Sequence, residues 1–187
     1  MAAQSQSNQL RAWTRGLLLA LAAVLAAAAL SAGALLALLA LLDPFGDAPH
    51  PSDATMLEQF RRQRPALEEL VGMIDNDDEL QRLAPDFTRP EPAPVPAARV
   101  ADYRQRLEAA GIAHGFGHYG DEIEFMVSTR GLAIAGSAKS ITYSAQTPRD
   151  AVVVEGDLDD AAAKLTDKDV LLARHIDESW WLLLDMR

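Results

Sequence analysis

The amino-acid sequence predicts an α+β domain that follows an N-terminal transmembrane helix. Residues 16–42 form a run without a single charge, and after Gly111 the apolar residues change from helical spacing to alternation. Helices first and strands later predict helices packed on one face of an antiparallel meander sheet of four to six strands. The 187 residues therefore divide into a short N-terminus (1–15), the apolar run, a tether (43–52) and a folded domain (53–187).

The apolar run is long enough to cross a lipid bilayer. It contains twelve Leu and eleven Ala among 27 residues. As an α-helix it would extend roughly 40 Å, against about 30 Å of hydrocarbon. Arg11 and Arg15 precede the run, whereas Asp43 and Asp47 follow it. Because positive residues stay inside, we expect a single-pass protein of the cytoplasmic (inner) membrane, with residues 1–15 in the cytoplasm and the domain outside.

A cleaved signal peptide is the alternative for this segment. The basic start, the apolar stretch and the small residues at 31–33 fit one. However, a signal sequence usually has an apolar region of about 7–15 residues, and here residues 35–42 continue the run. Both interpretations export the domain.

Composition excludes several functional classes. The chain has no cysteine, which excludes disulfides, thiol catalysis and lipid attachment at cysteine. Residues 43–187 hold 15 basic and 27 acidic side chains, a net charge of −12. Such a surface repels phosphate backbones, so nucleic acid is not an expected partner. The lipid bilayer is the partner expected for residues 16–42.

The helices are predicted from capping residues, from the helical spacing of apolar residues, and from prolines that interrupt a helix. Ser52 or Asp53 can cap a first helix, in which Pro65 predicts a kink or a break. A short helix is expected over 78–83, and an extended proline-rich segment over 85–96. The apolar stripe of the first helix comprises Met56, Leu57, Phe60, Leu67, Leu70, Val71 and Ile74.

A second helix opens at Pro96 or Ala97, and Gly111 suits its C-terminal cap. Strands follow it. Ile123, Phe125 and Val127 alternate with other residues as a half-buried strand does. Tight connections are expected at 128–131 and 177–179, and a weak helical turn at 159–165. Further strand candidates are 132–135, 140–143, 152–154, 170–176 and 180–184.

Three segments resemble a family of small bacterial envelope proteins. They are STRGL (128–132), GSAKSITYS (136–144) and IDESWW (176–181). The resemblance implies an N-terminal membrane signal, a helical segment, a strand pair joined near a lysine turn, and a closing strand that begins with Trp. It implies no activity. The chain has Ser140 and Ile141 where such proteins tend to have glycine and an aromatic residue.

Few residues are candidates for chemistry. His114 and His118 are four apart, a zinc spacing on a helix, and Asp121 could complete a metal site; a solvated loop is the alternative. A phosphate loop is excluded because Lys139 does not directly follow Gly136. No serine elbow and no calcium-loop order are present. The sequence therefore predicts no catalytic residue and no cofactor.

Trp180 and Trp181 point to opposite faces of a regular strand. One indole should enter the core. The other could form an exposed contact with a partner, or both could be structural. We therefore expect a membrane-anchored interaction or ligand-binding module, whose partner is an envelope protein or a small ligand. The alternative is an envelope enzyme, with or without a metal, which is favoured only if His114, His118, Asp121 and a serine converge in a pocket.

Overall fold

The computed structural model describes residues 49–132, 135–166 and 169–186. The predicted cytoplasmic N-terminus (1–15), the transmembrane helix (16–42) and most of the tether lie outside these residues. Within the described ranges, no helix combines the length and the apolar character needed to cross a membrane.

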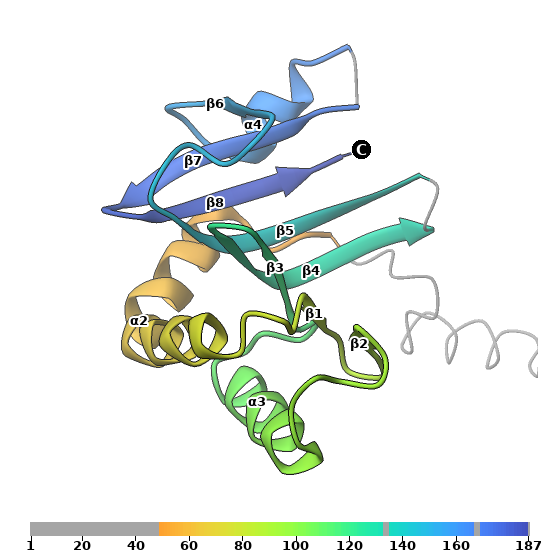
Figure 1. The fold of residues 1–187 in the computed structure, drawn as a ribbon. Coiled ribbons are helices and arrows are strands. Elements are labelled where there is room, and N and C mark those ends of the chain that lie inside the picture. Colours follow the sequence, from red (N-terminus) through yellow and green to blue (C-terminus); the bar gives the residue numbers. More distant parts are fainter. Residues whose placement is uncertain (1–48, 133–134, 167–168, 187) are drawn as a thin grey trace, which may run out of the picture. The chain divides into compact units, whose positions relative to one another are not determined.

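The described residues form an α+β domain with three helices and one mixed sheet of eight strands (Figure 1). This confirms the predicted class. The helices are α2 (Asp53–Asn76), α3 (Ala97–Ala109) and α4 (Leu158–Ala163). The strands are β1 (Arg82–Leu83), β2 (Thr88–Arg89), β3 (Phe116–Tyr119), β4 (Glu122–Leu132), β5 (Ala135–Ser144), β6 (Ala151–Val153), β7 (Leu171–Asp177) and β8 (Trp180–Asp185).

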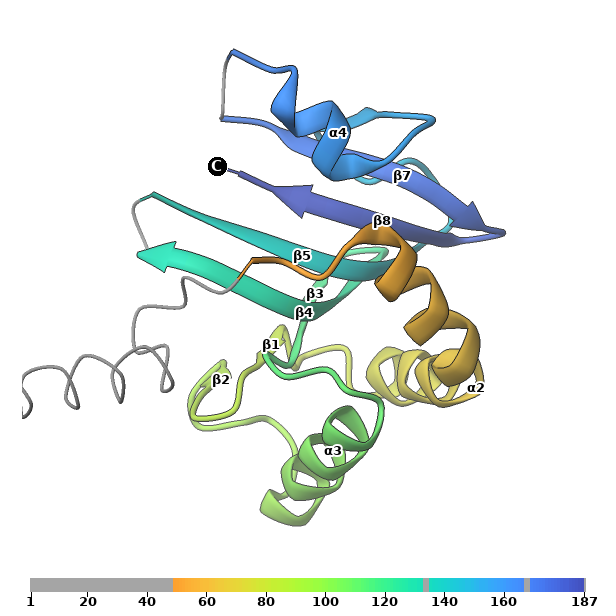
Figure 2. The ribbon, with the colours of Figure 1, turned by 180° about the vertical axis from the view of Figure 1, so that it is seen from behind.

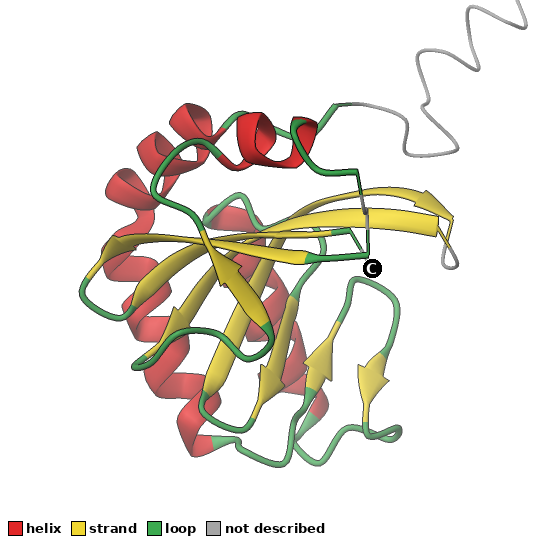
Figure 3. Cartoon of the chain, turned by 90° about the horizontal axis from the view of Figure 1, so that it is seen from above, coloured by secondary structure: helices red, strands yellow, loops and turns green. Residues whose placement is uncertain are grey.

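The sheet is larger than predicted and is not a simple meander. Its order is β2-β1-β3-β4-β5-β8-β7-β6, with a strong twist between strands (Figure 3). β6 pairs with β7 in parallel, whereas all other neighbours are antiparallel. Parallel neighbours need a crossover connection, and the segment that carries α4 supplies it. The prediction of four to six antiparallel strands was therefore wrong. The sheet has eight strands, and its edge strand β6 is parallel to its neighbour.

Two local predictions also fail. The segment predicted as a short helix over 78–83 instead ends in β1, which pairs with β2 and β3. The connection predicted at 128–131 lies inside β4, because Ser128 pairs with Lys139 and Gly131 with Gly136. The long strands β4 and β5 therefore pair with each other in antiparallel, with a register shift between Met126 and Ser128.

Local sequence explains the long helix α2. The Ser52 hydroxyl accepts a hydrogen bond from the Thr55 backbone N–H at 3.3 Å, as predicted for a cap. Pro65 lies inside the helix without ending it. The helix changes direction along its length (Figure 2), as a proline inside a helix predicts.

The main core lies between the sheet and the helices. Trp180 is its largest side chain and contacts the rings of Phe60, Phe125 and Tyr143 at centroid distances of 5.3, 6.2 and 5.2 Å. Residues of α2, α3 and α4 all join this core. Alternate residues of β7 and β8 form a smaller cluster on the opposite face, around Trp181. The prediction that the helices cover one face is confirmed.

Candidate functional site

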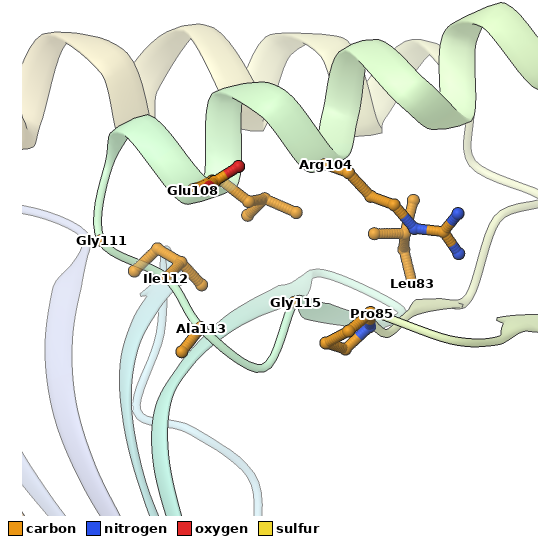
Figure 4. Close-up of a pocket in the computed structure, with 9 residues that line it drawn as sticks. Leu83, Pro85, Arg104, Glu108, Gly111, Ile112, Ala113 and Gly115 are labelled. Carbon is orange, nitrogen blue, oxygen red and sulfur yellow. The ribbon is translucent and has the colours of Figure 1, made fainter.

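A cavity of about 430 Å³ opens between α3, the segment that follows it, and the β1–β2 turn (Figure 4). We call it the α3 cavity. Its floor is apolar, since Leu83, Leu107 and Ile112 are only 1–3% exposed. The residues that line it are Leu83, Pro85, Arg104, Leu107, Glu108, Gly111, Ile112, Ala113 and Gly115.

Two glycines shape this cavity. Gly111 follows the cap residue Ala110 at the end of α3 and has a positive φ of 72°, as expected of a glycine that ends a helix. The Ile112 backbone N–H donates to the Leu107 carbonyl at 2.8 Å. Gly115 has a φ of 79°, and a Cβ atom there would lie 1.8 Å from the Leu83 carbonyl oxygen. Only glycine therefore lets this segment lie against β1 and close the floor.

Substitution of Gly115 by Ala should destabilise the domain by more than about 1 kcal/mol, because the new Cβ meets backbone and the φ becomes strained. The matched control is Gly72→Ala. Gly72 lies in α2 with nothing near its missing Cβ, so Ala should stabilise by about 0.5–1 kcal/mol. Urea denaturation of the full-length variants measures both effects. Equal stability of the two variants would contradict the close approach of Gly115 to β1.

The mouth of the cavity carries one cation and one anion from α3. The Arg104 guanidinium donates to the Ala84 carbonyl at 3.3–3.4 Å, and its side chain extends from α3 beside Leu83 (Figure 4). Glu108 is exposed, one helical turn further on, and the described ion pairs do not join it to Arg104. An apolar floor below a few charged groups is typical of sites for small organic molecules.

The predicted metal candidates do not form a site. His114 precedes β3, His118 lies within it, and Asp121 follows it. A strand rises about 3.3 Å per residue, so the length of β3 keeps His114, which precedes it, apart from Asp121, which follows it. Among the described residues, the one group of three or more side chains that offers ligand atoms within 4.8 Å of one another is Asp53, Asp157 and Asp159.

Neither tryptophan supplies the exposed indole considered from the sequence. Trp180 is 2% exposed and lies in the main core. Trp181 is 8% exposed on the opposite face, where its Nε1 donates to the Ser144 carbonyl at 3.2 Å. His175 packs edge-on against the Trp181 ring with centroids 4.7 Å apart. The two rings do point to opposite faces, as predicted, and both are buried in the folded domain.

The structure assembles a second group of side chains, which we call the Lys139 cluster: Lys139, Asp53, Asp159 and Arg174. The Lys139 side chain is 0% exposed, and its Nζ donates to Asp53 Oδ1 at 3.0 Å and to Asp159 Oδ2 at 2.7 Å. Its third acceptor is the Pro51 carbonyl at 3.1 Å. The ammonium thus lies against two of the three carboxylates that could hold a metal ion.

Sequence reasoning considered Lys139 as a phosphate-loop lysine and as the lysine of a turn, and it missed this cluster. A signal was present, because Lys139 falls in the same alternation as Ile141 and Tyr143, whose side chains face the main core. A lysine in the inward register of a strand requires buried acceptors. Its partner Asp53 is 86 residues away, so the sequence could not identify it.

His50 lies beside this cluster and joins two strands. Its ring nitrogens are 2.7 Å from the Ser128 hydroxyl in β4 and 2.8 Å from the Ser137 hydroxyl in β5. Burial lowers the pKa of the His50 imidazole below 6.5, and the positive charges of Lys139 and Arg130 lower it further, against the opposing effect of Asp159. The folded domain therefore favours the neutral ring.

Acidification should destabilise the domain in the range where histidine titrates. Burial also lowers the pKa of His114, with Arg82 adding to the effect. Because the unfolded histidines take up protons first, stability falls as the pH drops through about 6.5. The melting temperature should decline between about pH 7.5 and pH 5, and the His50→Gln, His114→Gln variant should show a smaller decline. An equal decline in both proteins would contradict the prediction.

The fold and the α3 cavity together define an α+β domain with a ligand-sized cavity on its helical side. No family model, no curated protein and no solved structure matches the chain. The likeness to small envelope proteins therefore stays a prediction.

Proposed function

We propose that this protein is a single-pass inner-membrane protein whose extracytoplasmic domain binds a small ligand in the α3 cavity. The uncharged run at 16–42 supports the anchor, and Arg11 and Arg15 support a cytoplasmic N-terminus. The observation that carries the ligand is the apolar floor of the α3 cavity, which lies below the charged side chains of Arg104 and Glu108.

The lining of the cavity indicates the class of ligand. Its volume of about 430 Å³ falls in the range that holds small organic molecules. The apolar floor suits an aliphatic or aromatic group. The Arg104 guanidinium suits a carboxylate, since arginine pairs with planar anions through two parallel hydrogen bonds. We therefore propose a small molecule with an apolar body and an anionic end.

Methyl NMR of the isotopically labelled full-length chain in phospholipid nanodiscs tests the ligand proposal. Phenylacetate, a small aromatic carboxylate, serves as the probe. The methyl signals of Leu83, Leu107 and Ile112 should shift on titration, because these side chains form the floor. Signals of the opposite apolar cluster, such as Leu183, should stay in place.

Two tryptophan substitutions provide matched variants. Ala113→Trp places a large ring on an exposed residue of the lining and should abolish the shifts. Ala109→Trp places the same ring on an exposed residue of α3 outside the lining and should leave them unchanged. Unshifted floor methyls in the wild-type chain would reject this ligand class, and equal effects of the two variants would reject this cavity.

Membrane topology can be tested separately because the chain has no cysteine of its own. A membrane-impermeant thiol reagent applied to intact cells should label Thr147→Cys, which is exposed in the domain. It should label Ser5→Cys only after the membrane is permeabilised. Labelling of Ser5→Cys in intact cells, or of Thr147→Cys only after permeabilisation, would reverse the proposed orientation.

The alternative of a metal-dependent envelope enzyme gains no support from the geometry. It requires His114, His118 and Asp121 to converge with a serine. His118 lines a separate cavity with Asp78, Gln81, Tyr119 and Gly120, which contains neither of the other two residues and no serine. We therefore favour ligand binding over catalysis.

A further inference from the structure

We propose that the Lys139 cluster forms an intramolecular isopeptide bond between Nζ of Lys139 and Cγ of Asp53, with Asp159 as the acid–base group. The bond would join the start of α2 to β5. This modification goes beyond the ligand binding proposed above and does not depend on it.

The reacting groups are already held together. Lys139 Nζ lies 3.0 Å from Asp53 Oδ1, and the two side chains are 0% and 1% exposed. The Pro51 carbonyl and Asp159 fix the ammonium from other directions at 3.1 and 2.7 Å. Such fixed proximity replaces a rare bimolecular encounter with an intramolecular one and removes most of its entropic cost.

The first step of the proposed reaction is a proton transfer within the enclosed Lys139–Asp53 pair. In water, an ammonium and a carboxylate are stabilised by hydration, which opposes their condensation to a neutral amide. In the folded domain both side chains are enclosed, and the proposed reaction begins when a proton moves along the 3.0 Å hydrogen bond from Nζ to Oδ1. The amine is the nucleophile.

The second carboxylate oxygen of Asp53 has the donors that an addition step needs. Oδ2 accepts the Leu158 backbone N–H at 2.9 Å and Arg174 Nη1 at 3.1 Å. When Nζ attacks Cγ, negative charge develops on Oδ2. Two fixed donors, one of them cationic, stabilise that charge as an oxyanion hole does.

The proposed reaction balances without any added reagent. The Nζ lone pair forms the N–C bond to Cγ, and the electrons of the C=O bond move to Oδ2. Asp159 takes a proton from Nζ and returns it to the Oδ1 hydroxyl. The C=O bond to Oδ2 then re-forms while the Cγ–Oδ1 bond breaks, so that Oδ1 leaves as water. The products are one amide and one water molecule, and Asp159 ends unchanged.

The exposure of the three side chains fits these roles. Asp159 is 48% exposed, so the departing water has a route to solvent beside it. Asp53 and Lys139 remain enclosed, which limits access of water to the new amide.

Peptide mapping of the full-length wild-type chain tests the proposal. The chain is purified, kept folded at neutral pH, and then digested with trypsin and analysed by mass spectrometry. Trypsin cleaves after Lys139 only if its side chain is free. We expect an uncleaved Lys139 peptide joined to the Asp53 peptide, at the summed mass less one water.

Two variants make the result specific. Asp159→Asn keeps a hydrogen-bond acceptor at a half-exposed position but removes the acid–base group, so the joined peptide should be absent although the circular dichroism spectrum stays that of the wild type. Lys164→Met, which removes an exposed lysine, should retain the joined peptide.

Three results would overturn the proposal. Complete cleavage after Lys139 in the folded wild-type chain would show that the pair remains ionic. Loss of water from the Asp53 peptide alone would show an internal cyclisation of that aspartate. A joined peptide formed equally in Asp159→Asn would remove Asp159 from the reaction.

Discussion

Substitution of Lys139 by Met should destabilise the domain by about 3–5 kcal/mol. The Asp53 carboxylate is 1% exposed, and without Lys139 it keeps only Arg174 and the Leu158 N–H as donors. Whether wild-type Lys139 is joined to Asp53 as an ion pair or as the amide proposed above, its removal leaves the Asp53 carboxylate charged, buried and short of donors. Since small domains are stable by about 5–15 kcal/mol, this loss removes a large part of the free energy of unfolding. Urea denaturation of the full-length chain, followed by circular dichroism, measures it.

A control variant distinguishes the effect of an unpaired buried charge from the effect of losing any lysine. Lys164→Met removes an exposed lysine and should change stability by no more than about 0.5 kcal/mol. The double variant Lys139→Met, Asp53→Asn removes both charges, so it should be more stable than Lys139→Met alone. A Lys139→Met variant as stable as Lys164→Met would mean that Lys139 is not buried among carboxylates.

Substitution of Trp180 by Ala should cost about 3–5 kcal/mol, because it empties the centre of the main core. The indole is 2% exposed and contacts three aromatic rings, from α2, β4 and β5. The variant loses these contacts and gains a cavity that the rigid sheet cannot close. The urea midpoint should fall while the slope of the transition stays constant.

Tyr119→Ala provides the contrast for this prediction. Tyr119 is another large aromatic residue at the end of a strand, but it is 52% exposed. Its loss should change stability by no more than about 0.5 kcal/mol. If both variants were equally stable, Trp180 would not be the centre of the core.

The sequence predicted those parts of the fold that depend on neighbouring residues. The cap at Ser52, the apolar stripe of α2 and the glycine after α3 were all found where predicted. The alternation from Ile123 onwards and the final strand pair, β7 and β8, were also found. In each case the signal is a periodic pattern or a capping residue that lies within a single helix or strand, so it can be recognised from one sequence.

The parts that were missed depend on residues far apart. β1 and β2 have two residues each, too few to show a period, and they form because β1 pairs with β3 on one side and with β2 on the other. The parallel pairing of β6 depends on β7, beyond α4. The α3 cavity likewise combines the β1–β2 turn with the end of α3. The pattern of residues within one segment does not indicate which distant segment it will pair with.

The Lys139 cluster has a consequence for how the domain would bear mechanical force. Tension applied along the chain from its N-terminal side reaches His50, Pro51 and Asp53 before it reaches the rest of α2. These three residues are held to β4 and β5 by two hydroxyls and one lysine. The load would therefore pass directly into the middle of the sheet, and α2 would not be peeled away turn by turn.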